Sequence, residues 1–289
     1  MRYGLTIFPT DQSIGVVELA KAAEDRGFQS LWVPEHTHIP VSRRTPSPAG
    51  EPLAEEYKRS LDPFVALTAA AAVTRRLVVG TGIALVAQRD PIVTAKAAAS
   101  LDWVSGGRFK LGIGFGWNHD EMEDHGVDPR TRRARAREHV LAMRALWEHE
   151  TAGYEGEFIR ISESWSWPKP RQSPLPVLVG GAPGPALFAH IAEYAQGWIP
   201  IGGAGLSGAI PHLQEALAGA GRDPASLEVI PFGSIPDHGK LDHFESIGVT
   251  ECVFRIPSAP EQKVLAVLDR YAAIIGERDS PGDSPLPAM

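Results

Sequence analysis

The sequence predicts a single α/β domain, a (β/α)8 TIM barrel, and three observations lead to this prediction. Eight short apolar segments alternate with segments of helical pattern along most of the 289 residues. Most of the apolar segments are continuous runs, which are typical of parallel strands covered on both faces. The chain is 43% hydrophobic and can bury one large core. Strand–helix alternation over this length favours a barrel; a doubly wound sheet is the structural alternative.

The expected strands follow one another at intervals that leave room for a helix. They are RYGLTIFP (2–9), SLWVPEH (30–36), LVVGTGIALV (77–86), RFKLGIGFG (108–116), LPVLVGG (175–181), GWIPI (197–201), LEVIPFG (227–233) and ECVFRI (251–256). The third strand is unusual because Gly80-Thr81-Gly82 interrupts its apolar run. Glycine inside a strand marks a bulge, or a close approach by another backbone or a ligand.

Helical patterns fill the intervals between the strands. They cover residues 13–27, 62–76, 90–107, 134–149, 183–196, 206–221, 238–248 and 258–276. Ser13 is the expected N-cap of the first pattern and Gly27 its C′ glycine. Asp62-Pro63 and Asp90-Pro91 each place an N-cap before a proline at the first helical position. We expect one domain over residues 1–276 and a disordered Pro/Ser-rich tail over 277–289.

Two insertions interrupt the alternation, one after the second strand and one after the fourth. Residues 37–61 form a long polar loop, and loops of this length in a compact domain are usually lids or binding segments. Residues 153–170 combine aromatic and turn residues and predict a hairpin.

Composition narrows the classes of partner. The net charge of −7 argues against a general nucleic-acid binder. No run of about 18 apolar residues occurs, so no membrane span is expected. The N-terminus shows no signal-peptide pattern, which predicts a cytoplasmic protein. The single cysteine, Cys252, lies in an apolar run and is expected to be an inert core thiol. We expect a small-molecule substrate and a homodimer.

The strand ends should carry the active site, because barrel enzymes place it at the carboxyl ends of the strands. This rim has few nucleophiles and no lysine suited to a Schiff base, and it is rich in glycine and aromatic residues. Such a rim suits a large flat cofactor better than covalent chemistry on a side chain. The candidate cofactor-binding residues are Phe8, Gly80, Thr81, Gly82, Ile83, Gly114, Phe115, Gly116, Gly180, Gly181 and Ala182.

The turn VGGAPG stands directly before a helical pattern. Backbone N–H groups at a helix N-terminus, with glycines that allow close approach, form an anion site. The segment therefore predicts a phosphate contact at Gly180-Gly181-Ala182. The alternative is a tight turn that needs glycine only for its backbone angles.

His36 and His38 form an H-x-H pair at the end of the second strand. Alternate strand residues face the same side, so both could enter the barrel mouth, as in a metal-dependent hydrolase. The other ligands of such a site are harder to find, because the eighth strand ends without a carboxylate. Metal-dependent hydrolysis is thus an alternative function.

Arginines are concentrated in RTRRARAREH, at the start of the helical pattern after the fourth strand. Cations at a helix N-terminus oppose the helix dipole, so a compensating interaction is expected. The arginines either pair with Glu121, Glu123 and Asp124 just upstream or bind an anionic ligand tail. Arg43-Arg44 in the long loop poses the same choice, with the acids of that loop as the structural partners.

Two stretches resemble a known family. DPIVTAKAAASLDWVSGGRFKLGIGFGWNHDEMEDHGV (90–127) and PLPVLVGGAPGPALFAHIAEYAQGW (174–198) are similar to the bacterial luciferase-like monooxygenases and their deazaflavin-dependent relatives. Gln196 stands where the family usually has an aspartate. The resemblance implies a barrel of the luciferase-like type with a flavin or deazaflavin across its rim. It also implies a bulge in the third strand with a cis peptide at Gly82–Ile83, behind the cofactor ring; an ordinary glycine bulge is the alternative.

The resemblance further implies an oxidoreductase that transfers a hydride between coenzyme F420 and a small organic substrate. Reduced FMN with oxygen is the alternative cofactor chemistry, and a barrel that binds the cofactor without turnover is a third hypothesis. His36 matches a family position that contacts cofactor or substrate. Trp117 replaces a glutamate that is catalytic in a sugar-phosphate-oxidising branch, which argues against that substrate and leaves the general acid unassigned. His36, Trp117 and Asn118 are the candidate catalytic residues.

Overall fold

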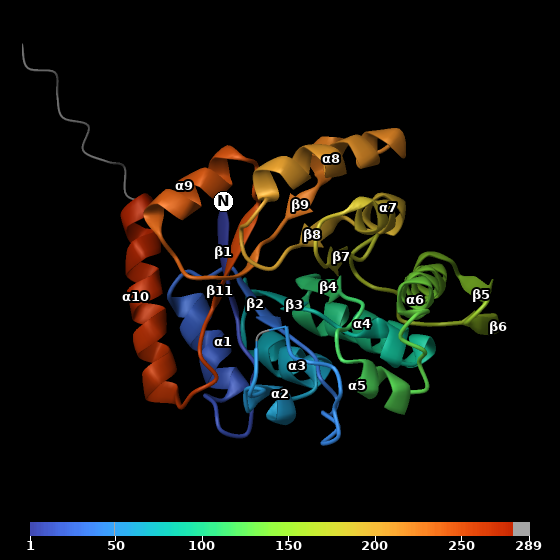
Figure 1. The fold of residues 1–289 in the computed structure, drawn as a ribbon, viewed down its shortest axis with the longest axis horizontal. Helices are drawn as coiled ribbons and strands as arrows, with labels where there is room; N and C mark the ends of the chain where they lie inside the picture. The colour runs from blue at the N-terminus through green and yellow to red at the C-terminus, as the bar shows by residue number, and fades with distance from the viewer. Residues whose placement is uncertain (49, 280–289) are drawn as a thin grey trace, which may run out of the picture.

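The computed structural model describes residues 1–48 and 50–279, and all neighbouring strands of its main sheet are parallel (Figure 1). The order is β10-β11-β1-β2-β3-β4-β7-β8-β9. The strands are β1 (Arg2–Thr6), β2 (Ser30–Val33), β3 (Val78–Thr81), β4 (Phe109–Ile113), β7 (Val177–Gly180), β8 (Gly197–Ile199), β9 (Glu228–Val229), β10 (Phe232–Ser234) and β11 (Glu251–Arg255). Each lies within a predicted strand or extends it by one residue.

The two ends of this sheet belong to one chain segment, and this closes the barrel. β9 pairs with β8, and β10, only two residues further on, pairs with β11. Between them the N–H of Ile230 donates to the carbonyl of Trp198, and the N–H of Val253 donates to the carbonyl of Pro231. Residues 228–234 therefore act as the predicted seventh strand. The (β/α)8 prediction is confirmed, and the doubly wound alternative is wrong.

The helices cover the outside of the barrel (Figure 1). The main ones are α1 (Val16–Asp25), α3 (Pro63–Val73), α4 (Pro91–Ser105), α6 (Arg132–Glu148), α7 (Pro185–Tyr194), α8 (Leu206–Gly219), α9 (His238–Ser246) and α10 (Glu261–Asp279). The described residues contain no helix long and apolar enough to cross a membrane.

The predicted helix caps are confirmed at three places and wrong at one. The Asp62 carboxylate accepts from the N–H groups of the first turn of α3, and Asp90 does the same for α4. Gly27 follows α1 with a positive φ of 82°. The N-cap of α1 is Gly15, because Ser13 instead accepts from the N–H of Thr10. α10 continues past Gly276, the expected domain end, to Asp279; the rest of the expected tail, 280–289, lies outside the described residues.

Both insertions occur where they were expected. β5 (Thr151–Glu155) and β6 (Arg160–Trp165) form an antiparallel hairpin. The loop 37–61 contains the short helix α2 (Glu56–Arg59) and contacts α5 (His119–Asp124), a helix that the sequence did not predict. Asp120 of α5 accepts from the backbone N–H groups of Arg44 and Thr45. The loop is thus attached next to the carboxyl ends of β2 and β4.

Gly80 of β3 and Gly82, which follows the strand, make room for rings inside the barrel. A Cβ on Gly80 would lie 2.3 Å from the indole of Trp32, and one on Gly82 would lie 2.3 Å from the ring of Phe232. Trp32 and Phe232 belong to a buried cluster with Leu178, Ile199, Ile230 and Val253. The close approach predicted at the strand glycines is therefore made by side chains. The Gly82–Ile83 peptide is cis, as the family resemblance implied.

Candidate active site

A cavity of about 360 Å³ lies at the carboxyl ends of the strands. Among its lining residues are ten of the predicted site residues: Phe8, His36, Gly82, Ile83, Gly114, Phe115, Gly116, Trp117, Gly180 and Gly181. A second hollow of about 200 Å³ shares several lining residues with it, including Phe8, Tyr57 and Phe232. The two hollows are adjoining lobes of one cleft in the barrel mouth.

Ile83 forms the centre of one wall of this cavity. A Cβ on Gly114 would lie 2.4 Å from Cδ1 of Ile83, and one on Gly180 would lie 2.9 Å from its Cγ2. The glycines at the ends of β4 and β7 therefore leave space for the Ile83 side chain. Ile83 and both glycines line the cavity, so this wall is apolar.

Four predicted site residues do not line the cavity. Gly80 lies against Trp32, and the buried Thr81 hydroxyl donates to the carbonyl of Gly112 at 2.7 Å. Asn118 is 1% exposed, and neither atom of its amide has a hydrogen-bond partner among the described residues. Ala182 is exposed to solvent. These four residues lie next to the strand ends in sequence, but the fold does not place them at the cavity surface.

His36 forms a buried pair with Glu121 of α5. Its Nδ1 lies 2.7 Å from Oε2 of Glu121, and the Thr37 N–H donates to Oε1 at 3.1 Å. Because a carboxylate only accepts, the contact places a hydrogen on Nδ1. In the described chain Nε2 has no protein partner, and the ring lines the cavity. Glu121 was expected to pair with the helix arginines; it instead orients His36.

Four rings gather around this histidine. The ring of Tyr57 lies 4.7 Å from Phe8 and 5.3 Å from His36, and Trp117 lies 5.6 Å from His36. We call Phe8, His36, Tyr57 and Trp117 the aromatic cluster; all four line the cavity. Burial raises the pKa of Tyr57, so its hydroxyl is a proton donor at neutral pH. Tyr57 was not predicted, because it comes from the middle of the polar loop.

The arginines of RTRRARAREH do not pair with Glu121, Glu123 or Asp124, so that expectation is wrong. Arg130 pairs with Asp128 at 2.6 Å and Arg137 pairs with Glu193. Arg132 and Arg133 line the cavity instead, and neither has a carboxylate partner within the described part of the chain. The Arg133 guanidinium lies 4.5 Å from the ring centre of Phe115. Nε of Arg132 is buried and has no hydrogen-bond partner there.

The upstream acids and the loop arginines are paired with one another across the rim. Arg44 contacts Asp120 at 2.7 Å and Glu123 at 2.5 Å. The Arg44 guanidinium holds the pKa of Asp120 well below its usual range. Arg43 pairs with Glu51 of its own loop, as the structural interpretation expected, and stacks over the ring of Trp117.

The H-x-H pair does not form a shared site. β2 ends at Val33, so strand alternation does not extend to the two histidines. His36 is buried against Glu121, whereas His38 is partly exposed and contacts Asp124 at 3.0 Å. No group of three or more His, Cys, Asp or Glu side chains in residues 1–48 and 50–279 is placed to hold a metal ion. The geometry gives the metal-hydrolase alternative no support.

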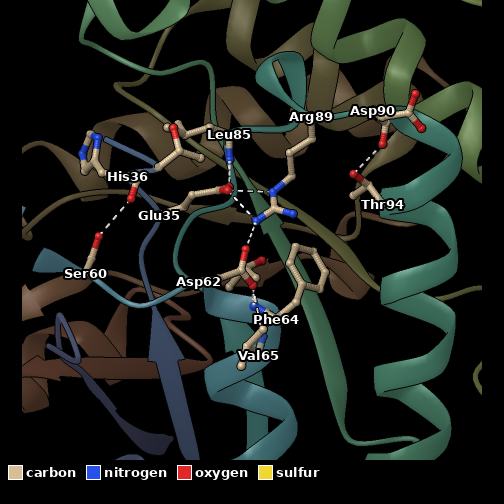
Figure 2. A network of polar contacts seen from close by, with 12 residues as sticks. Glu35, His36, Ser60, Asp62, Phe64, Val65, Leu85, Arg89, Asp90 and Thr94 are labelled. Atoms are coloured by element: carbon tan, nitrogen blue, oxygen red, sulfur yellow. Dashed lines mark hydrogen bonds and ion pairs between the residues drawn. The ribbon is translucent and has the colours of Figure 1, made fainter. Parts of the chain in front are cut away.

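Glu35, which also lines the cavity, holds the segment that follows the cis peptide (Figure 2). Its carboxylate accepts from the N–H of Leu85 at 2.7 Å and from Arg89 at 2.6 Å. Arg89 also contacts Asp62, the N-cap of α3, at 2.6 Å. Burial opposes the charge on Arg89, but Glu35 and Asp62 together raise its pKa. The network was missed because its members are distant in sequence.

The turn after β7 offers fewer donors than the sequence suggested. α7 begins at Pro185 with Gly184 as its N-cap, and Pro183 and Pro185 have no N–H. The N–H of Gly181 is directed to the carbonyl of Ile199 at 3.4 Å. A phosphate contact at Gly180-Gly181-Ala182 remains a prediction. Arg132 and Arg133 are the cationic side chains in the lining of the same cavity.

Sequence and structure comparisons agree with this architecture. A family model for luciferase-like monooxygenases matches residues 10–235. An uncharacterized protein of Mycobacterium tuberculosis is 44% identical over 281 residues, which cover 94% of this chain and 98% of that protein. An F420-dependent glucose-6-phosphate dehydrogenase of Kineococcus radiotolerans is 29% identical over 220 residues, 74% of this chain and 61% of that enzyme.

Two solved structures share the fold at low sequence identity. A monooxygenase from Streptomyces bottropensis superimposes with a TM-score of 0.79 at 22% identity, over 96% of this chain and 99% of that one. An F420-dependent secondary alcohol dehydrogenase, solved with an F420–acetone adduct, gives 0.77 at 19% identity over the same shares. From the match over residues 10–235, the chain belongs to the luciferase-like monooxygenase family, whose members are F420- or flavin-dependent oxidoreductases and monooxygenases.

Proposed function

We propose that the protein is an oxidoreductase that transfers a hydride between coenzyme F420 and a small organic substrate. The observation that carries the proposal is that one cavity is lined both by an apolar wall at Ile83 and by Arg132 and Arg133, which have no carboxylate partner among the described residues. F420 has a flat deazaflavin ring, a phosphate and an acidic tail. The apolar wall complements the flat ring of the coenzyme, and the two arginines complement its phosphate and acidic tail.

The described residues fit the coenzyme. Ile83, with Gly114 and Gly180 behind it, would support the ring, and the buried Nε of Arg132 has an unused donor for an anion. Arg132 and Arg133 would hold the phosphate and tail together with the turn Gly180-Gly181-Ala182. The deazaflavin supplies a ring carbon that exchanges a hydride with the substrate. The protein contributes position and a dry surface.

His36 is the proposed proton-exchanging residue. Its ring is fixed by Glu121, and Nε2 is available to the cavity. With Nδ1 protonated, Nε2 can accept a proton from a substrate hydroxyl and return it to a carbonyl oxygen. This assigns the general acid that Trp117, in place of a glutamate, left open.

The relatives support F420 without excluding a flavin. One relative and two structural neighbours are F420-dependent by name. Reduced FMN is the second candidate, favoured by the structural likeness to a monooxygenase. F420 is favoured here because its longer anionic part gives both cavity arginines a partner. A protein that binds the coenzyme without turnover is the third hypothesis.

The test is a fluorescence titration of the purified protein with F420 and with FMN. We expect tighter F420 binding, weakened about tenfold or more by Arg132→Met, which removes one charge-assisted contact. Arg130→Met is the matched control, because Arg130 is 90% exposed and pairs with Asp128. We also expect F420 affinity to fall more steeply with salt than that of a tail-less analogue. Tight FMN binding without F420 binding would overturn the assignment.

A homodimer and a cytoplasmic location remain proposals. Large apolar side chains are exposed on α3 and α4, including Val65 at 71% and Val93 at 64%. Trp167, 57% exposed, is beside them, because Lys96 of α4 donates to its carbonyl. We propose that a second copy covers this face. Light scattering should show a dimer for the native chain and a monomer for Val93→Asp; a native monomer would contradict the proposal.

A further inference from the structure

His190 of α7 lies behind the wall of the cavity, next to one of the arginines that line it. The ring of Phe115, which belongs to the lining, has the guanidinium of Arg133 at 4.5 Å from its centre. The ring of His190 lies 5.2 Å from the same phenyl ring. His190 is half-buried and lies outside the residues that line the cavity. The wall at Phe115 thus connects Arg133 with a titratable group that a ligand in the cavity does not touch.

No hydrogen bond fixes the protonation state of His190. Among the described residues, neither of its ring nitrogens has a hydrogen-bond partner, and its neighbours are the rings of Phe115 and Tyr194. Two other buried histidines differ in this respect. His36 gives its Nδ1 to a carboxylate, and both nitrogens of His139 contact backbone carbonyls. His190 can therefore gain or lose a proton without breaking a contact.

The charges that act on His190 come from α6 and α7. Burial and the charge of Arg133 hold the pKa of His190 below its usual 6.5. Arg137 also disfavours the proton and Glu193 favours it, but these two form an ion pair with each other. Burial raises the pKa of the neighbouring Tyr194, so its hydroxyl stays neutral. Within the described part of the chain, Arg133 is thus the cation beside the ring that lacks a carboxylate partner.

We propose that His190 takes up a proton when an anion binds at Arg133, and that the cavity therefore holds an anionic coenzyme more tightly as the pH falls. An anion beside Arg133 neutralises the charge that keeps the imidazole unprotonated. By linkage, a ligand that favours the protonated form binds better where that form is populated. His190 is then a positioning residue, because it acts through Arg133 and not on the ligand itself.

This inference rests on the proposed function in one respect, that the phosphate or tail of the coenzyme is the anion. F420 and FMN both carry a phosphate, so the coupling does not depend on which of the two is bound. It requires only that the anion lies close enough to Arg133 to compensate its charge.

The sign of the effect follows from the protonation of the free and the bound protein. Well above the usual pKa of 6.5 the ring is neutral in both, and the affinity does not depend on it. As the pH falls, the bound protein gains the proton first, because its Arg133 charge is neutralised. A charge about two side chains away, at the effective dielectric of a protein, shifts a pKa by roughly one unit, so the affinity should rise by about threefold to tenfold.

The first experiment measures F420 and FMN affinity by isothermal titration calorimetry at about pH 8 and about pH 5.5, on either side of the histidine range. His190→Phe keeps a ring against Phe115 and Tyr194 and removes the ionisation. We expect the native affinity to rise by about threefold to tenfold more than that of His190→Phe. The comparison cancels the titration of the ligand and of His36, which both proteins share.

His212→Phe is the matched control. His212 is 72% exposed on α8, and this variant should keep the native dependence on pH. The same dependence in native protein and in folded His190→Phe would overturn the inference.

The second experiment needs no ligand, because Arg133→Met imitates the neutralised state. The imidazole signal of His190 is followed by NMR during a pH titration and is assigned by its loss in His190→Phe. We expect the pKa of His190 to be higher in Arg133→Met than in the native protein, since the repelling charge is gone. Arg130→Met, which removes an arginine that is 90% exposed and paired with Asp128, should leave it unchanged.

The two proposals fail in different ways. If neither F420 nor FMN binds, the proposed function fails and the coenzyme is not the anion. An unchanged pKa of His190 in Arg133→Met contradicts the coupling itself, whatever the coenzyme. Coenzyme binding with equal pH dependence in native protein and His190→Phe contradicts the role of His190 and leaves the coenzyme assignment in place.

Discussion

At the scale of single residues, the site depends on contacts between side chains far apart in the sequence. His36 and Glu121 are separated by 85 positions and meet because β2 and β4 end at the same rim of the barrel. The pair leaves one ring nitrogen for chemistry and gives the other to a carboxylate. A histidine held in this way presents a fixed proton acceptor.

Glu121→Gln tests this positioning role. The amide no longer gives the His36 ring a charged acceptor as a carboxylate does, so we expect kcat to fall about tenfold or more. F420 affinity should stay unchanged, since Glu121 does not line the cavity. Glu123→Gln, in the same helix but paired with Arg44, is the control. A loss of F420 affinity as large as the loss of kcat would reduce Glu121 to a structural role.

At the scale of elements, single acidic side chains attach the insertions to the barrel. Glu138 of α6 is 8% exposed and accepts from the N–H groups of Glu157, Phe158 and Ile159 in the hairpin turn, at 2.9, 2.8 and 3.0 Å. Burial raises its pKa, but the three N–H donors bring the value below the usual 4.5. The carboxylate therefore stabilises the folded state above pH 4.5, and this contribution is lost as the pH falls through the lower folded value.

Glu138→Gln should lower the free energy of unfolding by about 1–3 kcal/mol at pH 7, because one N–H loses its acceptor in a buried turn. The difference from the native chain should shrink as the pH is lowered below 4.5. Urea unfolding at several pH values measures both effects, with the exposed Glu157→Gln as the control. A loss of the same size at every pH would contradict the ionised acceptor.

Asp120 has the corresponding role for the loop 37–61. It accepts from two backbone N–H groups, the Thr45 hydroxyl and the Arg44 guanidinium. Asp120→Ala should make tryptic cleavage at Arg43 and Arg44 several-fold faster than in the native protein, because loop opening no longer breaks these contacts. Asp124→Ala, which removes only the His38 contact, should cleave at the native rate. Equal rates for Asp120→Ala and the native chain would show that other contacts hold the loop.

The elements were more predictable from the sequence than the site. Strands and capped helices follow from local patterns such as the apolar run at 77–79 and the Asp-Pro starts at 62 and 90. The helix α5 was missed because HDEMED has a single apolar residue, Met122, and so shows no helical apolar pattern. The cis peptide was expected only through the family resemblance. Tyr57, Glu121 and the network of Glu35 required the fold, since no spacing rule connects a loop to a helix across the rim.

At the scale of the whole molecule, the closed barrel brings cationic and aromatic side chains together in one cleft. The chain has a net charge of −7, yet two arginines without a carboxylate partner among the described residues line the same cavity as the aromatic cluster. Closure through residues 228–234 places Phe232 and Ile201 opposite the ends of β1 and β2. An acidic protein that binds an anionic coenzyme needs such a local cationic region.

The central claim is hydride transfer with F420, and the most direct test follows a deuterium atom. The protein is supplied with F420 reduced with deuterium at the reactive ring carbon, together with cyclohexanone, and the product is analysed by mass spectrometry. The account predicts cyclohexanol with deuterium on the carbinol carbon, formed at an oxygen-independent rate and abolished in His36→Ala. The contradicting result is oxygen-dependent turnover with reduced FMN. In that case the product contains an oxygen atom from O2, and no deuterium is transferred from F420.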